Sequence, residues 1–91
     1  MLNLPPKRWK KARLEPQGQG AYVLTFLTPL RDRAEFKAIL REDIEMCLDE
    51  GDRVTRANWE ERSLTLEIAD YKAFRRRLVY VNILLEDPAA T

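Results

Sequence analysis

The chain has 91 residues, of which 45% are hydrophobic and 34% are charged. This length allows one core and excludes two independent domains, while the hydrophobic fraction excludes wholesale disorder and the charged fraction excludes an integral membrane protein. Sixteen Lys and Arg against fifteen Asp and Glu leave a net charge of +1, so any attraction for nucleic acid must be local. The chain has no histidine and one cysteine, which argues against an enzyme, a metal site or an internal disulfide and favours the reducing cytoplasm.

Residues 1–20 differ from the rest of the chain, and we expect a basic N-terminal arm or edge strand there, ahead of a single α+β domain over residues 21–91. Five cations against one acid give this segment a net charge of +4; the cations are Lys7, Arg8, Lys10, Lys11 and Arg13. Gly18 and Gly20 provide the positive φ that a tight turn needs. A hairpin between residues 9–14 and the next strand is therefore expected.

A strand and a long helix follow the arm. Residues 21–28 are rich in β-branched and aromatic side chains and are apolar on both faces, which is typical of a central strand. The next segment predicts a helix over about residues 30–50, with Thr28 or Asp32 as its N-terminal cap. Cys47 lies on the apolar stripe of this helix, and we expect it in the core because no histidine is present to activate it.

The second half of the chain predicts a hairpin and a second helix. The runs 53–60 and 62–70 alternate in the manner of a half-buried hairpin, and residues 71–86 change to helical spacing before Pro88. The predicted fold class is α+β: an antiparallel sheet with two helices on one face, in the order strand, helix, strand, strand, helix, with or without an extra N-terminal strand. The expected core side chains are Leu24, Phe26, Phe36, Leu40, Leu66, Ile68, Phe74 and Leu78.

Two groups of cations are candidate nucleic-acid contacts. In the arm, Lys and Arg side chains neutralise phosphates while the indole of Trp9 stacks on a base or sugar. The alternative is a solvated edge strand whose lysines prevent aggregation, with Trp9 packed on the core. On the second helix, Lys72, Arg75 and Arg76 lie within two turns and suit a phosphate backbone, unless they pair with acids of neighbouring elements.

Residues 42–52 form an acidic block that carries six acids and no Lys or Arg: Glu42, Asp43, Glu45, Asp49, Glu50 and Asp52. This block repels nucleic acid, and it either keeps the protein in solution or docks a basic partner or divalent ions. Its spacing does not match a calcium loop, so no metal and no cofactor are expected.

The second helix also predicts a partner surface. Val79, Tyr80, Ile83 and Leu84 lie beside its main apolar stripe and provide more apolar surface than a core of this size covers. We therefore expect a homodimer, or a heterodimer with a paralogous subunit, formed through these side chains.

Residues 22–85 follow the order strand, helix, hairpin, helix, and within them Leu64-Thr-Leu-Glu-Ile-Ala-Asp70 leads into Phe74-Arg75-Arg76-Arg77-Leu78. This arrangement resembles the small dimerising subunit family of the KEOPS complex. In that family an acidic residue ends the last strand and an arginine stands near the start of the following helix, as Asp70 and Arg75 do here. The family's asparagine one turn later is Val79 in this chain, which favours a divergent paralogue.

The resemblance implies a KH-like, non-catalytic accessory subunit. Such a subunit would dimerise, dock the kinase-like catalytic subunit of KEOPS and help to hold tRNA for threonylcarbamoyladenosine (t6A) modification. The alternatives are a stand-alone KH-like RNA-binding module, although no G-x-x-G backbone clamp is present, and a small acylphosphatase-like enzyme, whose anion-binding loop cannot be located.

Overall fold

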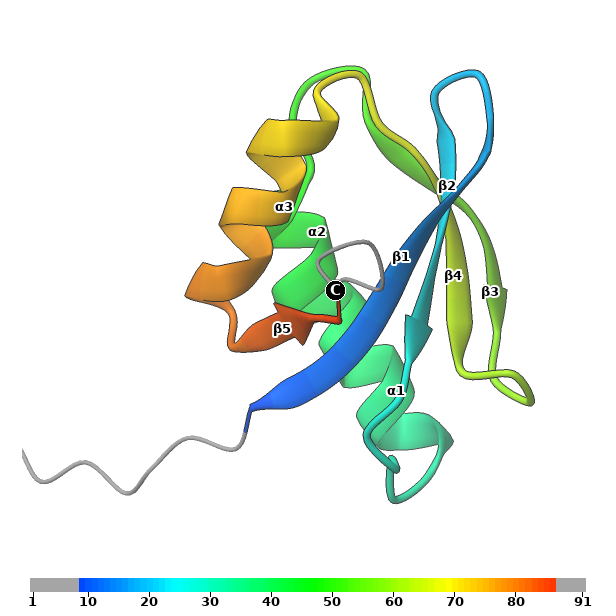
Figure 1. Cartoon of the computed structure of the whole chain (residues 1–91). Coiled ribbons are helices and arrows are strands. Elements are labelled where there is room, and N and C mark those ends of the chain that lie inside the picture. Colours follow the sequence, from blue (N-terminus) through cyan, green and yellow to red (C-terminus); the bar gives the residue numbers. More distant parts are fainter. Residues whose placement is uncertain (1–8, 87–91) are drawn as a thin grey trace, which may run out of the picture.

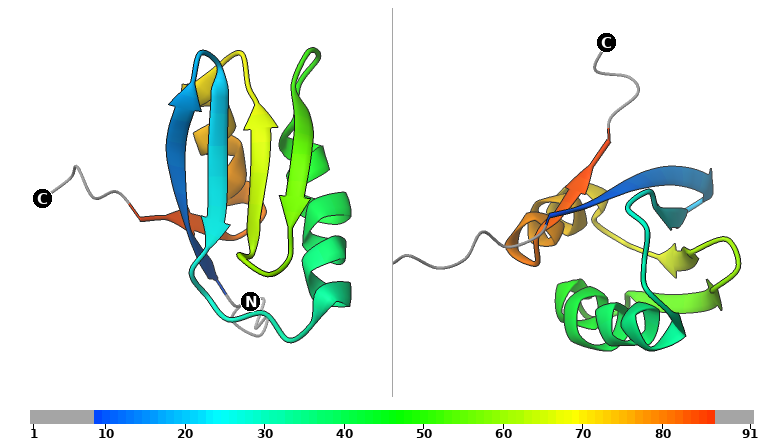
Figure 2. Two further views of the ribbon diagram at one scale, coloured as in Figure 1. Left: turned by 90° about the vertical axis from the view of Figure 1, so that its right-hand side faces the viewer. Right: turned by 90° about the horizontal axis from the view of Figure 1, so that it is seen from below.

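The computed structural model describes residues 9–86, which fold into a five-stranded sheet with two helices packed on one of its faces (Figure 1). The strands are β1 (Lys10–Gly18), β2 (Ala21–Phe26), β3 (Arg53–Asn58), β4 (Ser63–Glu67) and β5 (Ile83–Leu85). The first helix is continuous over residues 33–47 and consists of α1 (Arg33–Ala38), η1 (Ile39–Ile44) and α2 (Glu45–Cys47). The second helix is α3 (Tyr71–Tyr80). The predicted α+β class and the placement of both helices on one face are confirmed (Figure 2).

The strand order in the sheet is β3-β4-β2-β1-β5. All neighbouring strands are antiparallel except β1 and β5, which pair in parallel through Lys10 with Ile83 and Ala12 with Leu85. The prediction of a purely antiparallel sheet was therefore wrong at this edge. The reason is that α3 joins β4 to β5 as a helical crossover, so β5 runs in the direction of β4. β1 runs in that direction too, because β2 is antiparallel to both β1 and β4.

The extra N-terminal strand is present, and it is longer than expected. β1 pairs with β2 from Ala12 opposite Phe26 to Gly18 opposite Ala21, and Gly20 makes the turn with a φ of 70°. Because β5 pairs with its first residues, β1 is interior there rather than an edge strand. Residues 10–18 thus belong to the same sheet as the rest of the described chain.

The first helix begins later and ends earlier than the predicted 30–50. Asp32 is its N-cap and accepts a hydrogen bond from the backbone N–H of Glu35 at 2.9 Å, whereas the hydroxyl of Thr28 accepts one from the N–H of Lys11. Leu48 is already extended after Cys47. In the η1 segment the wider π-helical turn brings residues five apart onto one face, so Ile39 and Ile44 are both buried.

The second helix is shorter than the predicted 71–86. It begins as expected, with the Asp70 carboxylate accepting a hydrogen bond from the N–H of Ala73 at 3.1 Å. It ends because Asn82 adopts a φ of 65° and donates its N–H to the carbonyl of Val79. A single residue in the left-handed conformation commonly ends an α-helix in this way. Ile83 is then fully buried as part of β5, so the prediction of helix over 81–86 was wrong.

The core lies between the sheet and the helices. Seven of the eight predicted core side chains are buried, and Cys47 is buried with them as expected. The exception is Leu40, which is half-buried because the π-helical turn places Ile39 on the core side instead. Ala12, Leu14 and Ile83 complete the core from the two strands at the β5 side of the sheet. No helix within residues 9–86 is long and apolar enough to cross a membrane.

Candidate nucleic-acid interface

The cations of the basic arm are divided between two faces of the sheet. Side chains of β1 alternate, and because Ala12 and Leu14 point to the helices, Lys11 and Arg13 lie on the open face. Lys10 lies on the helix side, where it lines a cleft of about 490 Å³ that also holds the acids Asp32, Glu35, Glu42 and Asp43. Trp9 is 45% exposed, so the alternative in which it packs on the core does not hold. Lys7 and Arg8 lie outside the described residues.

Arg13 is a paired cation. Its guanidinium forms a 2.7 Å ion pair with Glu86, and the hydrogen bond and charge of Glu86 raise the pKa of Arg13. Its Nε is shielded from solvent and has no hydrogen-bond partner within residues 9–86. A phosphate would have to compete with Glu86 for this guanidinium, so Lys11 is the more available cation on the open face.

The cations of α3 also differ in their availability. Lys72 and Arg76 are exposed one turn apart, on the side of α3 opposite the buried Phe74. Arg75 is half-buried, and its guanidinium lies 5.6 Å from the ring centre of Tyr71, which itself stacks on Tyr22. Lys72 and Arg76 are therefore the two α3 cations that point into solvent.

The fold brings the arm to the C-terminal end of α3 without merging the two groups of cations. The N–H of Lys10 donates to the carbonyl of Asn82 at 2.9 Å, so the start of β1 lies beside the end of the helix. Lys72, however, lies in the first turn of α3, and Lys11 lies on the opposite face of the sheet. The cations therefore do not form one basic surface: Lys11 lies on the open face of the sheet, Lys10 lies beside acids on the helix side, and Lys72 and Arg76 lie along α3.

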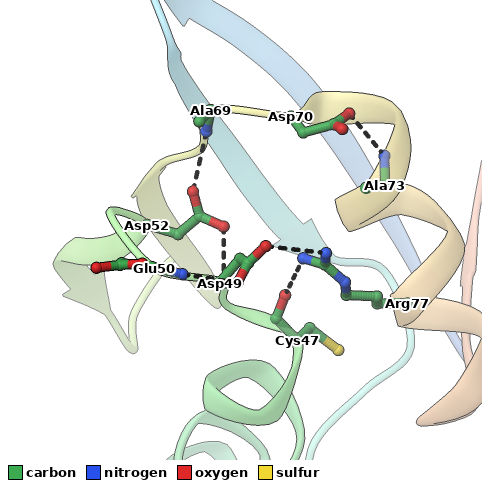
Figure 3. Close-up of polar contacts among 8 residues, drawn as sticks. All are labelled: Cys47, Asp49, Glu50, Asp52, Ala69, Asp70, Ala73 and Arg77. Carbon is green, nitrogen blue, oxygen red and sulfur yellow. Dashed lines mark hydrogen bonds and ion pairs between the residues drawn. The ribbon is translucent and has the colours of Figure 1, made fainter.

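Two acids of the 42–52 block have structural roles (Figure 3). The carboxylate of Asp52 accepts hydrogen bonds from the N–H groups of Asp49 and Ala69, at 2.8 and 2.9 Å. Arg77 donates to the carbonyl of Cys47 at 3.2 Å and forms a 3.3 Å ion pair with Asp49. These contacts join the end of the first helix to α3 and to the β4–α3 connection, so Arg77 is not part of the exposed basic face.

The predicted partner surface is divided by the end of α3. Val79 and Tyr80 are 49% and 84% exposed on the helix, and Leu84 is 41% exposed on β5. Ile83 is fully buried, so its assignment to a partner interface was wrong. Strand alternation sends Ile83 into the core and Leu84 to the opposite face, so only Val79 and Tyr80 form the expected helical surface.

Three cations that the sequence analysis did not single out lie around one cleft between α1 and β3. Arg33 and Lys37 contribute from the helix and Arg56 from the strand. The spacing of Arg33 and Lys37, four residues apart on one helix, is visible in the sequence, but their proximity to Arg56 depends on how the helix packs beside β3.

The comparisons with known proteins identify no family. The chain matches no protein-family model, no curated protein and no solved structure. Within residues 9–86, no group of three or more His, Cys, Asp or Glu side chains is placed to hold a metal ion.

Proposed function

We propose that this protein is a non-catalytic subunit of a KEOPS-like complex, a divergent paralogue of its small dimerising subunit, that mediates dimerisation and tRNA binding in t6A modification. The support is the order β2, first helix, β3, β4, α3, which is the order on which the resemblance rests. Asp70 and Arg75 stand at the start of α3, where the family has its acid and its arginine. The absence of histidine from the whole chain favours an accessory role.

The observation that carries the assembly part of this proposal is the exposure of Tyr80. This aromatic side chain is 84% exposed, next to the 49% exposed Val79, at the C-terminal end of α3. Aromatic side chains grouped with other apolar residues on a surface mark interaction sites more often than isolated ones do. We assign this end of α3 to the contact with a second copy, with a paralogous subunit, or with the kinase-like catalytic subunit.

The RNA part of the proposal uses the half-exposed Lys10 and the exposed Lys11 at the start of β1, and the exposed cations on α3. Lys10 and Lys11, together with Lys72 and Arg76, form no ion pair with the residues that the structure describes. Because cations bind phosphates by releasing counterions, such a surface binds RNA although the molecule is nearly neutral.

Assembly is tested by size-exclusion chromatography with light scattering at about 100 μM, well above typical specific dissociation constants. The protein alone, or mixed with a standard small KEOPS subunit, is expected to elute as a dimer, and Tyr80→Glu is expected to elute as a monomer. Met46→Glu is the matched control, because Met46 is 76% exposed on the other helix. A protein that is monomeric both alone and in the mixture contradicts the assembly proposal.

RNA binding is tested by titrating tRNA at several salt concentrations. Lys10→Glu with Lys11→Glu should weaken tRNA binding and flatten its salt dependence while leaving dimerisation intact. Arg31→Glu with Arg53→Glu makes the same change in net charge at cations that already pair with Glu35 and Glu67, and should have the smaller effect. Equal effects of the two variants would count against the arm, and a stable monomer that binds RNA unaided would favour the stand-alone RNA-binding module.

A further inference from the structure

A cleft of about 530 Å³ lies between α1 and the edge strand β3. Phe36, Leu40 and Trp59 provide its apolar and aromatic lining. The ring of Phe36 meets Trp59 edge to face at 5.7 Å and meets Phe26 of β2 at 6.4 Å, so the aromatic lining is continuous with the core. A half-buried indole held in this way is a preorganised surface for a flat ring.

The rim of this cleft is positive. Arg33, Lys37 and Arg56 line it together with the single acid Glu60, which leaves a net charge of +2. These three cations are exposed and form no ion pair or side-chain hydrogen bond within residues 9–86.

Two neighbouring arginines, by contrast, form ion pairs with acids of the protein. Arg31 pairs with Glu35 just before α1, and Arg53 pairs with Glu67 on β3. Arg33 and Lys37 of α1 and Arg56 of β3, which form no ion pair within residues 9–86, are thus the cations of these segments that line the cleft.

Aromatic side chains beside unpaired cations are the combination that binds a nucleotide. The base stacks on the indole, and the phosphate is held by Arg and Lys side chains. A purely apolar ligand would leave the cations unused, and a simple anion would leave the aromatic lining unused. The volume is within the range of clefts that bind small molecules, which is large enough for one nucleotide.

The cleft continues at both ends, which favours a polymer over a free nucleotide. On one side Lys37 is shared with a second hollow that also contains Arg41, one turn further along the helix. On the other side Arg56 and Asn58 are shared with a polar hollow on the open face of the sheet, lined by Ser63 and Thr65. Each hollow also contains one acid, Glu42 in the first and Glu61 in the second, but cations and neutral hydrogen-bonding groups outnumber them on the path into the aromatic cleft and out of it.

An acidic peptide is the competing occupant, because β3 is an edge strand and edge strands accept added strands. The pairing of β3 with β4 is interrupted by a bulge between Val54 and Arg56. A bulge twists the edge and disrupts the regular spacing of its free N–H and C=O groups, which hinders strand addition. An acidic peptide would use the cations of the cleft, but its backbone pairing with β3 would leave the aromatic lining without a role.

We propose that the cleft between α1 and β3 binds single-stranded nucleic acid, with one base on Trp59 and its phosphates on Arg33, Lys37 and Arg56. The inference rests on the proposed function for the choice of RNA as the polymer, and it adds a contact surface distinct from the arm and from α3.

The test uses a fluorescein-labelled RNA octamer of mixed sequence and the full chain carrying Trp9→Phe, so that Trp59 is the remaining tryptophan. Binding is followed by anisotropy, and stacking is followed by quenching of Trp59 fluorescence. The octamer is expected to bind and to quench Trp59. Arg33→Gln with Lys37→Gln should weaken binding at least tenfold and reduce the slope of log affinity against log salt by about 1.4, or about 0.7 for each lost phosphate contact.

The matched control is Arg31→Gln with Arg53→Gln, which removes the same charge from the same segments and should bind the octamer within about twofold of the parent. Trp59→Leu should weaken binding at least fivefold through lost stacking. If that variant fails to fold, the quenching signal and the two surface variants, which lie outside the core, still decide the outcome.

The proposal would be overturned by equal effects of the two charge variants, by binding without quenching of Trp59, or by binding of uridine monophosphate as tightly as the octamer. Displacement of the octamer by double-stranded RNA at equal concentration, or tighter binding of an acidic peptide, would overturn it as well. Lys10 and Lys11 do not line the cleft, so the octamer should still quench Trp59 fluorescence in the variant with Lys10→Glu and Lys11→Glu. Loss of tRNA binding in that variant with Trp59 quenching retained would separate the arm from the cleft, and a failure of the cleft leaves the arm and the dimer to be judged by their own tests.

Discussion

Asn82 combines two features that end a helix: a left-handed φ of 65° and an N–H donated to the carbonyl of Val79. A side chain with a Cβ disfavours this conformation, and asparagine and glycine tolerate it best. Asn82→Gly should therefore leave the free energy of unfolding unchanged or slightly higher, whereas Asn82→Ala should lower it by about 1 kcal/mol. Urea denaturation of the three proteins measures both changes, and equal stabilities of the Ala and Gly variants would contradict the left-handed assignment.

Cys47 is 2% exposed, and burial followed by the charge of Asp43 raises the pKa of its thiol. A folded-state pKa above the unfolded value stabilises the protein at low pH, and this contribution is lost as the pH rises through the two values. The stability of the wild type should therefore fall relative to that of Cys47→Ala above about pH 8.5, and the difference should be constant at lower pH. Denaturation at several pH values checks this, and a difference that stays constant up to pH 10 would show that the thiol is not desolvated.

At the scale of secondary-structure elements, β5 gives adjacent apolar residues opposite environments. Ile83 is fully buried and Leu84 is 41% exposed on the other face of the sheet. Ile83→Ala should cost about 2–4 kcal/mol of unfolding free energy, and Leu84→Ala should cost less than about 1 kcal/mol. A helix through this segment would expose both side chains to a similar extent, so similar costs in urea denaturation would contradict the strand.

At the scale of the whole molecule, the first and last described strands hold each other in place. β1 pairs with β5 from Lys10 to Ala12, and the N–H of Glu86 donates to the carbonyl of Ala12 at 2.8 Å. A chain ending after Val81 loses this pairing and the buried Ile83, and it should lose its cooperative unfolding transition. A chain ending after Glu86 is the control and should keep that transition. Proteolysis and thermal unfolding distinguish the two chains, and retention of a cooperative transition by the shorter one would show that β5 is dispensable.

Elements whose signals are local follow from the sequence alone. The alternation of Leu64 and Leu66 predicts β4, and the helical spacing of Phe74 and Leu78 predicts the start of α3, because these patterns act within a few residues. The same patterns identify the buried faces of β4 and α3, since apolar side chains must share one side to form a core.

The strand β5 and the grouping of the cations, by contrast, depend on the tertiary structure. A three-residue apolar run such as Ile83–Leu85 fits a helix or a strand equally well, and its partner β1 lies about seventy residues away in the sequence. Likewise, Arg33 and Lys37 meet Arg56 only because the first helix packs beside the edge strand, while β1 alternation sends Lys10 and Lys11 to opposite faces. The physical reason is the same in both cases: pairing and packing join residues that are distant in the chain, and these contacts, rather than local preference, set their environment.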